Sequence, residues 1–196
     1  MRAPAAATDL GGMDNVLVTR LDVQDQESIY RAIEAGIVRF GRSDALINIA
    51  GFGLAGVFEP IPRGKVLEQF DINVFGVMEV TRVILPHFRK QMGGLIINIS
   101  SRAGIVGLPM LSLYCAAKYA LEGFSESLAY ELASQNNVVK NVEPSGGVSI
   151  TNFSERMGRE QFAFGLQCLR YPHECAFRRP AGEPEDECGR CCRGHI

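Results

Sequence analysis

Short apolar runs alternate with longer segments of helical periodicity along most of the chain. The apolar runs, which are typical of buried strands, cover residues 15–23, 45–50, 95–100 and 138–143. Apolar positions recur at helical spacing between these runs, over residues 25–40, 65–92 and 113–133. Because strands alternate with helices and are almost wholly apolar, the pattern predicts a parallel sheet with helices on both faces. The expected fold class is α/β, a doubly wound parallel sheet in three αβα layers.

Particular residues mark the ends of the predicted helices. Asp25 can cap the first helix with its side chain, and Gly41 can end it because glycine tolerates left-handed backbone. Pro86 is expected to kink the second helix near its end. Asn73 is a polar residue inside the wide apolar pattern of that helix, which makes it a candidate for a specific role.

Length and charge narrow the classes of protein that fit. With 196 residues, 46% of them hydrophobic, the chain is long enough for one domain with a sizeable core. A net charge of -2 gives no reason to expect nucleic-acid binding, and no run of about 18 apolar residues predicts a membrane span. Residues 1–13 lack the basic and apolar regions of a secretory signal, so we expect a cytoplasmic protein.

The cysteines are concentrated at the C-terminal end. Only Cys115 precedes residue 168, and the other five lie in the last 29 residues, which is not the even spacing of a disulfide framework. Cys188, Cys191, Cys192 and His195 have a spacing that resembles zinc ligands. The abrupt change in composition fits a disordered tail better, so no metal site is expected.

A hydroxyl, a phenol and an amine come together in the sequence at Ser101, Tyr114 and Lys118. Tyr114 and Lys118 are four residues apart in a predicted helix, so their side chains share one face. An ammonium beside a phenol lowers the pKa of the phenol and makes it a useful acid or base. The simpler alternative for a Tyr-x-x-x-Lys pair is an exposed helix face.

Candidate residues also follow the ends of several predicted strands. Asp22, Asn48, Gly51, Ser101 and Pro144 each lie at or just beyond the carboxyl end of an apolar run. Ligands of doubly wound sheets bind outside these ends. The sequence therefore predicts one binding site along this edge of the sheet.

Four motifs in this order resemble the short-chain dehydrogenase/reductase family over about residues 14–156. They are Asn-Ile-Ala-Gly at 48–51, Asp-Ile-Asn-Val-Phe-Gly at 71–76, Asn-Ile-Ser-Ser at 98–101, and Tyr-Cys-Ala-Ala-Lys at 114–118. Ser101 lies thirteen residues before Tyr114, the usual interval in that family, which favours Ser101 over Ser100. On this basis the chain divides into residues 1–13, a partial Rossmann-fold domain at 14–157, and a divergent tail at 158–196.

The resemblance implies hydride transfer with NAD or NADP and a small-molecule alcohol or carbonyl substrate. It implies that Tyr114 is the general acid/base, that Lys118 lowers its pKa and binds the nicotinamide ribose, and that Ser101 binds the substrate oxygen. It also implies a water held by Asn73, for which a purely structural role is the alternative. The implied cofactor-binding residues are Asp22, Val23, Asn48, Ala50, Gly51, Tyr114, Lys118, Pro144, Val148 and Thr151. The alternative for Asp22 is a purely structural role as a turn residue at the end of a strand.

The sequence departs from the family pattern in three places. There is no Gly-x-x-x-Gly-x-Gly motif to hold the cofactor pyrophosphate, so the predicted domain is incomplete at its start. The residue that distinguishes NAD from NADP in the family belongs to the same missing elements, so this sequence does not indicate which of the two is used. Ile49 replaces the usual second Asn. The segment 144–151 is about two residues longer than the family's Pro-Gly-x-Val-x-Thr, which makes Val148 and Thr151 uncertain ligands.

Two functions follow from this combination of matches and departures. The first is an NAD(P)-dependent oxidoreductase that interconverts an alcohol and a ketone or aldehyde, self-associating through the helices around Asn73 and Tyr114. The second is an inactive remnant of such an enzyme that interacts with full-length homologues. The intact set Ser101, Tyr114, Lys118 and Asn73 favours the first, and the missing Gly-rich turn favours the second.

Overall fold

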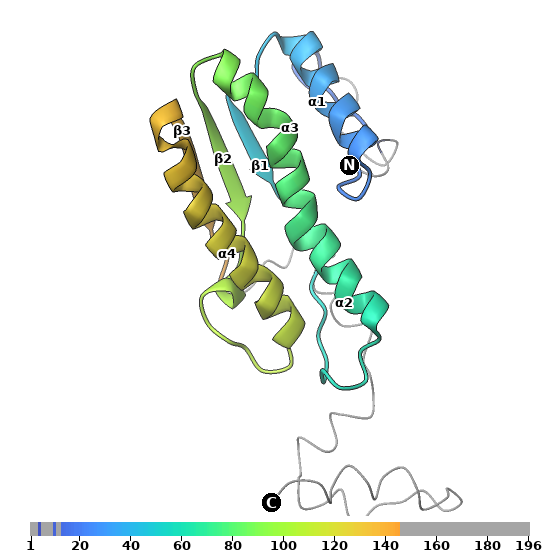
Figure 1. Cartoon of the computed structure of the whole chain (residues 1–196). Coiled ribbons are helices and arrows are strands. Elements are labelled where there is room, and N and C mark those ends of the chain that lie inside the picture. Colours follow the sequence, from blue (N-terminus) through green and yellow to red (C-terminus); the bar gives the residue numbers. More distant parts are fainter. Residues whose placement is uncertain (1–3, 5–9, 11–12, 146–196) are drawn as a thin grey trace, which may run out of the picture. The chain divides into compact units, whose positions relative to one another are not determined.

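The computed structural model describes residues 4, 10 and 13–145, which lie in the first of two units, Met1–Gln161 and Phe162–Ile196. The longer helices are α1 (Gln26–Phe40), α2 (Arg63–Phe70), α3 (Gly76–Lys90) and α4 (Ser112–Leu132). The strands are β1 (Ala45–Asn48), β2 (Gly94–Ile99) and β3 (Asn137–Val142). The short elements are the π-helical turn η2 (Asp71–Phe75) and the 3-10 turns η3 (Arg102–Gly104) and η4 (Ala133–Gln135). Figure 1 shows these elements in place.

The three strands form one parallel sheet in the order β1-β2-β3. Ile47 of β1 is in register with Ile97 of β2, which is in register with Lys140 of β3. The chain runs from each strand to the next through at least one helix, because two parallel strands need a long crossover connection. The predicted Rossmann-like parallel sheet is confirmed, and within the described residues it is incomplete, with three strands.

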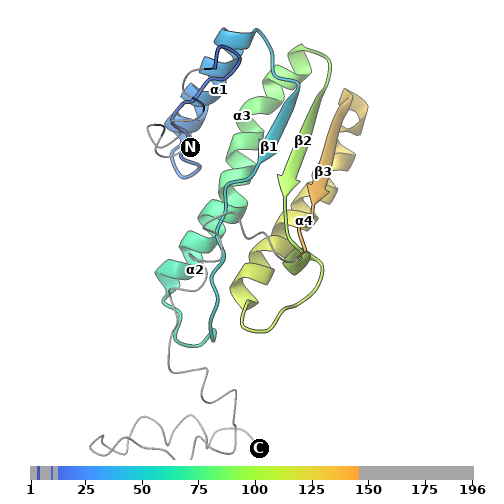
Figure 2. The same ribbon diagram turned by 180° about the vertical axis from the view of Figure 1, so that it is seen from behind.

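Helices α3 and α4 pack against one face of this sheet, and α1 packs against α3. Helices α3 and α4 lie in front of the strands in Figure 1 and behind them in Figure 2. Phe88 and Ile96, both fully buried, form the centre of the core that joins α3, α4 and β2. The side chains that alternate onto the opposite face are more exposed, for example Ile47 at 51%. The described residues thus supply the sheet and one helix layer of the expected three-layer arrangement.

The predicted ends of α1 are confirmed. Asp25 is the N-cap, and its Oδ1 accepts a hydrogen bond from Ser28 N at 3.1 Å. Gly41 is the C-cap, with a φ of 81° in the left-handed region, and its N donates to Ile37 O. The carboxylate of Asp25 also has a lowered pKa because it accepts the Ser28 backbone hydrogen bond and pairs with Arg20.

The predicted strand at residues 15–23 is wrong. This segment is irregular and ends in turns around Asp22, although Val16, Val18 and Leu21 remain partly buried. A strand needs a hydrogen-bonded neighbour, and among the described residues β1 pairs with β2 alone. The apolar residues of this segment therefore pack against the rest of the fold without forming a strand. Val23, for example, lies against the backbone of Gly76.

The predicted helix at 65–92 is confirmed, with a feature that the sequence did not reveal. Helices α2 and α3 are joined end to end by the π-helical turn η2 at Asp71–Phe75. Asn73 lies inside this turn. Pro86 lies inside α3, and the helix continues past it to Lys90. The long helix therefore changes its hydrogen-bonding pattern at the polar residue that the sequence singled out.

Candidate active site

Three side chains named from the sequence meet at the carboxyl end of β2. Ser101 follows β2, and its Oγ accepts a hydrogen bond from Ala103 N at 3.2 Å, which caps η3. Tyr114 and Lys118 lie one turn apart near the start of α4, and each is only 5% exposed. The side chain of Ser101 is hydrogen-bonded to Tyr114. The structure therefore brings Ser101, Tyr114 and Lys118 together, while their chemical roles stay predictions.

The Lys118 ammonium is bound to the backbone at the end of β2. Its Nζ donates a hydrogen bond to Ile99 O at 2.7 Å and lies 5.8 Å from the centroid of the Tyr114 ring. Burial disfavours the charged form and lowers the pKa of Lys118 to about 8, while the negative charge of Glu122 acts in the opposite direction. Lys118 therefore loses its proton much closer to neutral pH than an exposed lysine does.

The acidity of Tyr114 differs from the expectation. Burial raises the pKa of the Tyr114 phenol, the hydrogen bond from Ser101 offsets part of this rise, and Cys115 adds to it. The sequence predicted a lowered pKa for Tyr114, and this is wrong for the structure, because burial of the phenol is the largest influence on its pKa. At neutral pH, Tyr114 is therefore a neutral phenol with a proton to donate.

The lowered pKa of Lys118 predicts a pH-dependent stability. The folded chain binds the Lys118 proton with a pKa of about 8, below the ordinary 10.5, so the free energy of unfolding rises with pH between these values. Lys118→Met, which cannot titrate, should remove this rise of roughly 3 kcal/mol. Urea unfolding at several pH values measures the rise, and Lys90→Met, at an exposed position, serves as the control. The same rise in Lys118→Met as in Lys90→Met would contradict the prediction.

Asn73 is fully buried and fixes the loop that follows β1. Its Oδ1 accepts a hydrogen bond from Phe52 N at 3.0 Å, and its Nδ2 donates to Phe52 O at 2.7 Å. A Cβ on Gly51 would lie 2.8 Å from Asn73 Oδ1, so the close approach requires glycine. The structural role of Asn73 is thus visible, and its role in holding a water stays a prediction.

Two further buried polar groups near the site were not predicted. Gln69, which is fully buried, donates from Nε2 to Phe52 O at 2.9 Å, beside the contact that Asn73 makes. The sequence signal that could have identified Gln69 is its position four residues before Asn73, which places both side chains on the same face of the helix. In the second group, Asn98 Nδ2 donates to Ser125 Oγ at 2.8 Å, which joins β2 to α4.

A cavity of about 860 Å³ lies beside β1. Five of the predicted cofactor-binding residues are among those that line it: Asp22, Val23, Asn48, Ala50 and Gly51. The amide of Asn48 is already engaged, because its Nδ2 donates to Asn98 Oδ1 at 2.8 Å and to Thr81 Oγ1 at 3.4 Å. Asn48 therefore contributes to the wall of the cavity while its amide supports the sheet.

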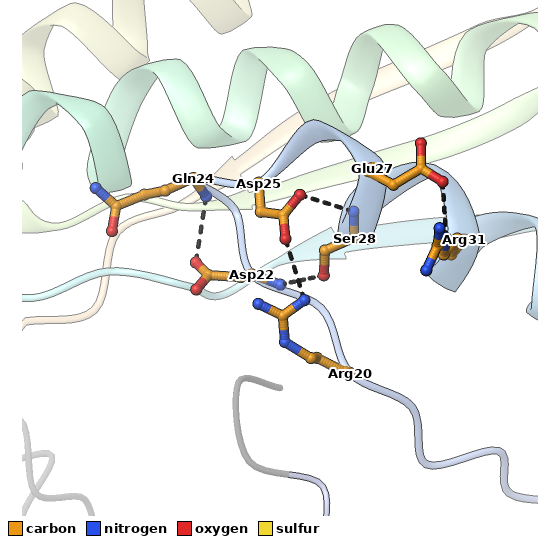
Figure 3. A network of polar contacts seen from close by, with 7 residues as sticks. All are labelled: Arg20, Asp22, Gln24, Asp25, Glu27, Ser28 and Arg31. Atoms are coloured by element: carbon orange, nitrogen blue, oxygen red, sulfur yellow. Dashed lines mark hydrogen bonds and ion pairs between the residues drawn. The ribbon is translucent and has the colours of Figure 1, made fainter.

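Asp22 forms the turn before α1, as Figure 3 shows. Its Oδ1 accepts a hydrogen bond from Gln24 N at 3.3 Å, and its backbone N donates to Ser28 Oγ at 2.9 Å. Arg20 and Asp25 form an ion pair next to this turn, with Nη1 and Oδ2 3.1 Å apart. The structure thus gives Asp22 the turn role that the sequence left open, at a position on the cavity wall. Its role in binding the cofactor stays a prediction.

The remaining predicted ligands follow β3. Pro144 is the last of them in the described residues, and its O accepts a hydrogen bond from Arg102 N at 3.3 Å, which places it next to η3. Val148 and Thr151 lie outside the described residues, as do the Cys-rich segment 188–195 and its possible zinc site.

The described part of the chain contains neither a cluster of metal ligands nor a helix that could cross a membrane. Across residues 13–145, no three His, Cys, Asp or Glu side chains lie close enough together to hold a metal ion. In the same part of the chain, every helix is too short or too polar to cross a membrane.

Comparison with known proteins assigns the class of protein that has this sheet and this group of side chains. A model of the short chain dehydrogenase family matches residues 2–161, so the chain belongs to that family. The family assignment made from the four sequence motifs is therefore confirmed.

Individual relatives agree with this assignment. An uncharacterized oxidoreductase of Schizosaccharomyces pombe is 42% identical over 158 residues, which are 81% of this chain and 66% of the relative. A short-chain dehydrogenase structure from Streptomyces avermitilis has a TM-score of 0.71 at 32% identity, covering 81% of this chain and 64% of that one. A structure of ElxO with NADP bound has a TM-score of 0.66 at 30% identity, covering 73% of this chain and 57% of that one. This chain thus spans no more than about two thirds of the length of these relatives.

Proposed function

We propose that this chain carries the active-site part of an NAD(P)-dependent oxidoreductase that interconverts an alcohol and a ketone or aldehyde. The observation that carries the proposal is the group formed by Ser101 and the buried Tyr114 and Lys118 at the carboxyl end of a parallel strand. Membership of the short chain dehydrogenase family and the NADP bound to the similar ElxO support a nicotinamide cofactor.

The residues of the cavity beside β1 fit part of such a cofactor. Val23 and Ala50 offer apolar surface to a base, and the Asp22 carboxylate can accept a hydrogen bond from an amino group. The cavity lies along β1, and two of its lining residues, Asn48 and Gly51, lie at or just beyond the carboxyl end of this strand. Ligand sites of doubly wound sheets are expected at this end of the strands. Asp22, Val23, Asn48, Ala50 and Gly51 would hold this part, and Tyr114, Lys118 and Pro144 would hold the rest.

The chemistry of the proposed site follows from the protonation states. The nicotinamide supplies or accepts the hydride when it is bound. During carbonyl reduction, negative charge grows on the carbonyl oxygen, and Tyr114 donates its phenolic proton to that oxygen. The Ser101 hydroxyl stabilises the same charge by a hydrogen bond, and the Lys118 ammonium stabilises the phenolate that remains. Oxidation of an alcohol uses the same groups in reverse.

The proposed substrate is a small-molecule alcohol or carbonyl compound. We also propose that the protein forms homo-oligomers through the helices around Asn73 and Tyr114, which light scattering would test. In support, large apolar side chains on these helices are about half exposed, namely Leu67, Phe75 and Tyr119. A cytoplasmic location is proposed on the sequence alone.

Titration of the purified chain with NADH and NADPH, followed by fluorescence, tests the proposal. We expect saturable binding that is at least about tenfold weaker in Lys118→Ala, because a buried cationic contact is lost. Lys90→Ala, which removes an exposed lysine at the end of α3, should bind like the parent chain. A folded sample that binds neither cofactor would overturn the proposal and favour the inactive remnant.

A further inference from the structure

A partly buried carboxylate lies one helical turn beyond Lys118. Glu122 follows Lys118 by four residues on α4, so the two side chains lie on the same face of the helix. The Oε2 atom of Glu122 accepts a hydrogen bond from Asn141 Nδ2 of β3. Its Oε1 atom is also buried and has no hydrogen-bond partner in the structure. The carboxylate is therefore fixed by β3 while half of its acceptor capacity stays unused.

The backbone of Gly104 packs closely against the Glu122 side chain. A Cβ on Gly104 would lie 3.0 Å from Glu122 Cγ, 2.9 Å from Ser100 Oγ and 3.1 Å from Lys118 O. Three segments, the end of β2, η3 and α4, thus meet at this glycine. The Glu122 side chain therefore lies close to Gly104 of η3 and is hydrogen-bonded to Asn141 of β3.

Glu122 is the charged group that counteracts the burial of Lys118. Lys118 is 5% exposed, and of the described side chains only the negative charge of Glu122 favours its charged form. Other charged groups lie on or beside the elements that pack against α4 without this effect, namely Arg63, Lys65, Glu68, Asp71, Arg102, Lys140 and Glu143. On α4 itself, the next acidic residue is Glu126, which is exposed.

We propose that Glu122, fixed by Asn141, is a positioning residue that keeps the Lys118 ammonium charged for the reaction. The proposal rests on the proposed function, since it assigns Glu122 a part in preparing Lys118 for catalysis. Glu122 acts through Lys118 and touches neither substrate nor cofactor in this scheme. The carboxylate of a helix residue would thus compensate for the burial of the lysine one turn away.

Nuclear magnetic resonance of the lysine Cε groups tests this directly. The Lys118 signal, assigned by its loss in Lys118→Arg, should titrate with a midpoint near pH 8 in the parent chain. Glu122→Gln removes the charge with little change of shape and should lower the midpoint by about 0.5 to 1 pH unit. Glu126→Gln removes a charge from the exposed side of the same helix and should leave the midpoint unchanged.

A midpoint that stays in place in folded Glu122→Gln would overturn the proposal. Glu122→Asp keeps the charge on a shorter side chain and provides the second test, with an expected midpoint between those of the parent and Glu122→Gln. An unchanged or raised midpoint in Glu122→Asp, if Glu122→Gln fails to fold, would equally overturn it. Because the readout needs no cofactor, a shifted midpoint without NADH or NADPH binding would contradict the proposed function alone.

Discussion

Tyr114→Phe is expected to lower the rate of alcohol and carbonyl interconversion by a factor of about 10² to 10⁴. The substitution removes the proton that the phenol donates and leaves the ring, which is 5% exposed, to fill the same space. The fold and the affinity for NADH or NADPH should change little, because the hydroxyl is the only group lost. Steady-state kinetics with the best substrate of a carbonyl screen would measure the effect.

Tyr119→Phe is the matched control for this experiment. Tyr119 lies on the same helix, is 46% exposed, and loses the same hydroxyl group. Its rate should equal that of the parent chain. Equal rates for Tyr114→Phe and Tyr119→Phe would show that the phenol of Tyr114 is not the proton donor.

Gly94→Ala should lower the free energy of unfolding by about 1 to 3 kcal/mol or more. A Cβ at Gly94 would lie 2.4 Å from the ring of Phe88, which is fully buried in the core. The ring cannot move aside without disturbing its contacts with Ile96 and Leu128 in the same cluster. Urea unfolding followed by circular dichroism gives the change in free energy.

Gly123→Ala is the control, and it is expected to change the free energy of unfolding in the opposite direction. Gly123 lies inside α4, and a Cβ there would meet nothing within 4 Å. Alanine favours helix over glycine by about 1 kcal/mol, so this variant should be slightly more stable than the parent. Similar destabilisation by both substitutions would show that the contact with Phe88 is not the reason why residue 94 must be glycine.

The sequence was sufficient where local signals decide the structure. Asp25 and Gly41 marked the ends of α1 because a cap depends on a few neighbouring atoms. The convergence of Ser101 with Tyr114 followed from strand ends and helical spacing, which parallel sheets place at one edge.

The sequence was insufficient where distant partners decide. Residues 15–23 have the apolar pattern of a strand, but pairing depends on a neighbour elsewhere in the chain. The pKa of Tyr114 depends mainly on how deeply the phenol is buried, which spacing does not reveal. The pairing of Asn141 with Glu122 likewise joins residues from two elements.

The π-helical turn at Asp71–Phe75 limits the insertions and deletions that the long helix can accept. A π turn adds one residue to an α-helix, which corresponds to a rotation of about 100° for all that follows. On one side of the turn Gln69 must meet the backbone of Phe52, and on the other Phe88 must meet the sheet. Removing a single residue from the turn would rotate one of these contacts away from its partner. The number of residues in this helix is therefore fixed by its two separate contacts, with the loop at Phe52 and with the sheet, and not by the helix propensity of its residues.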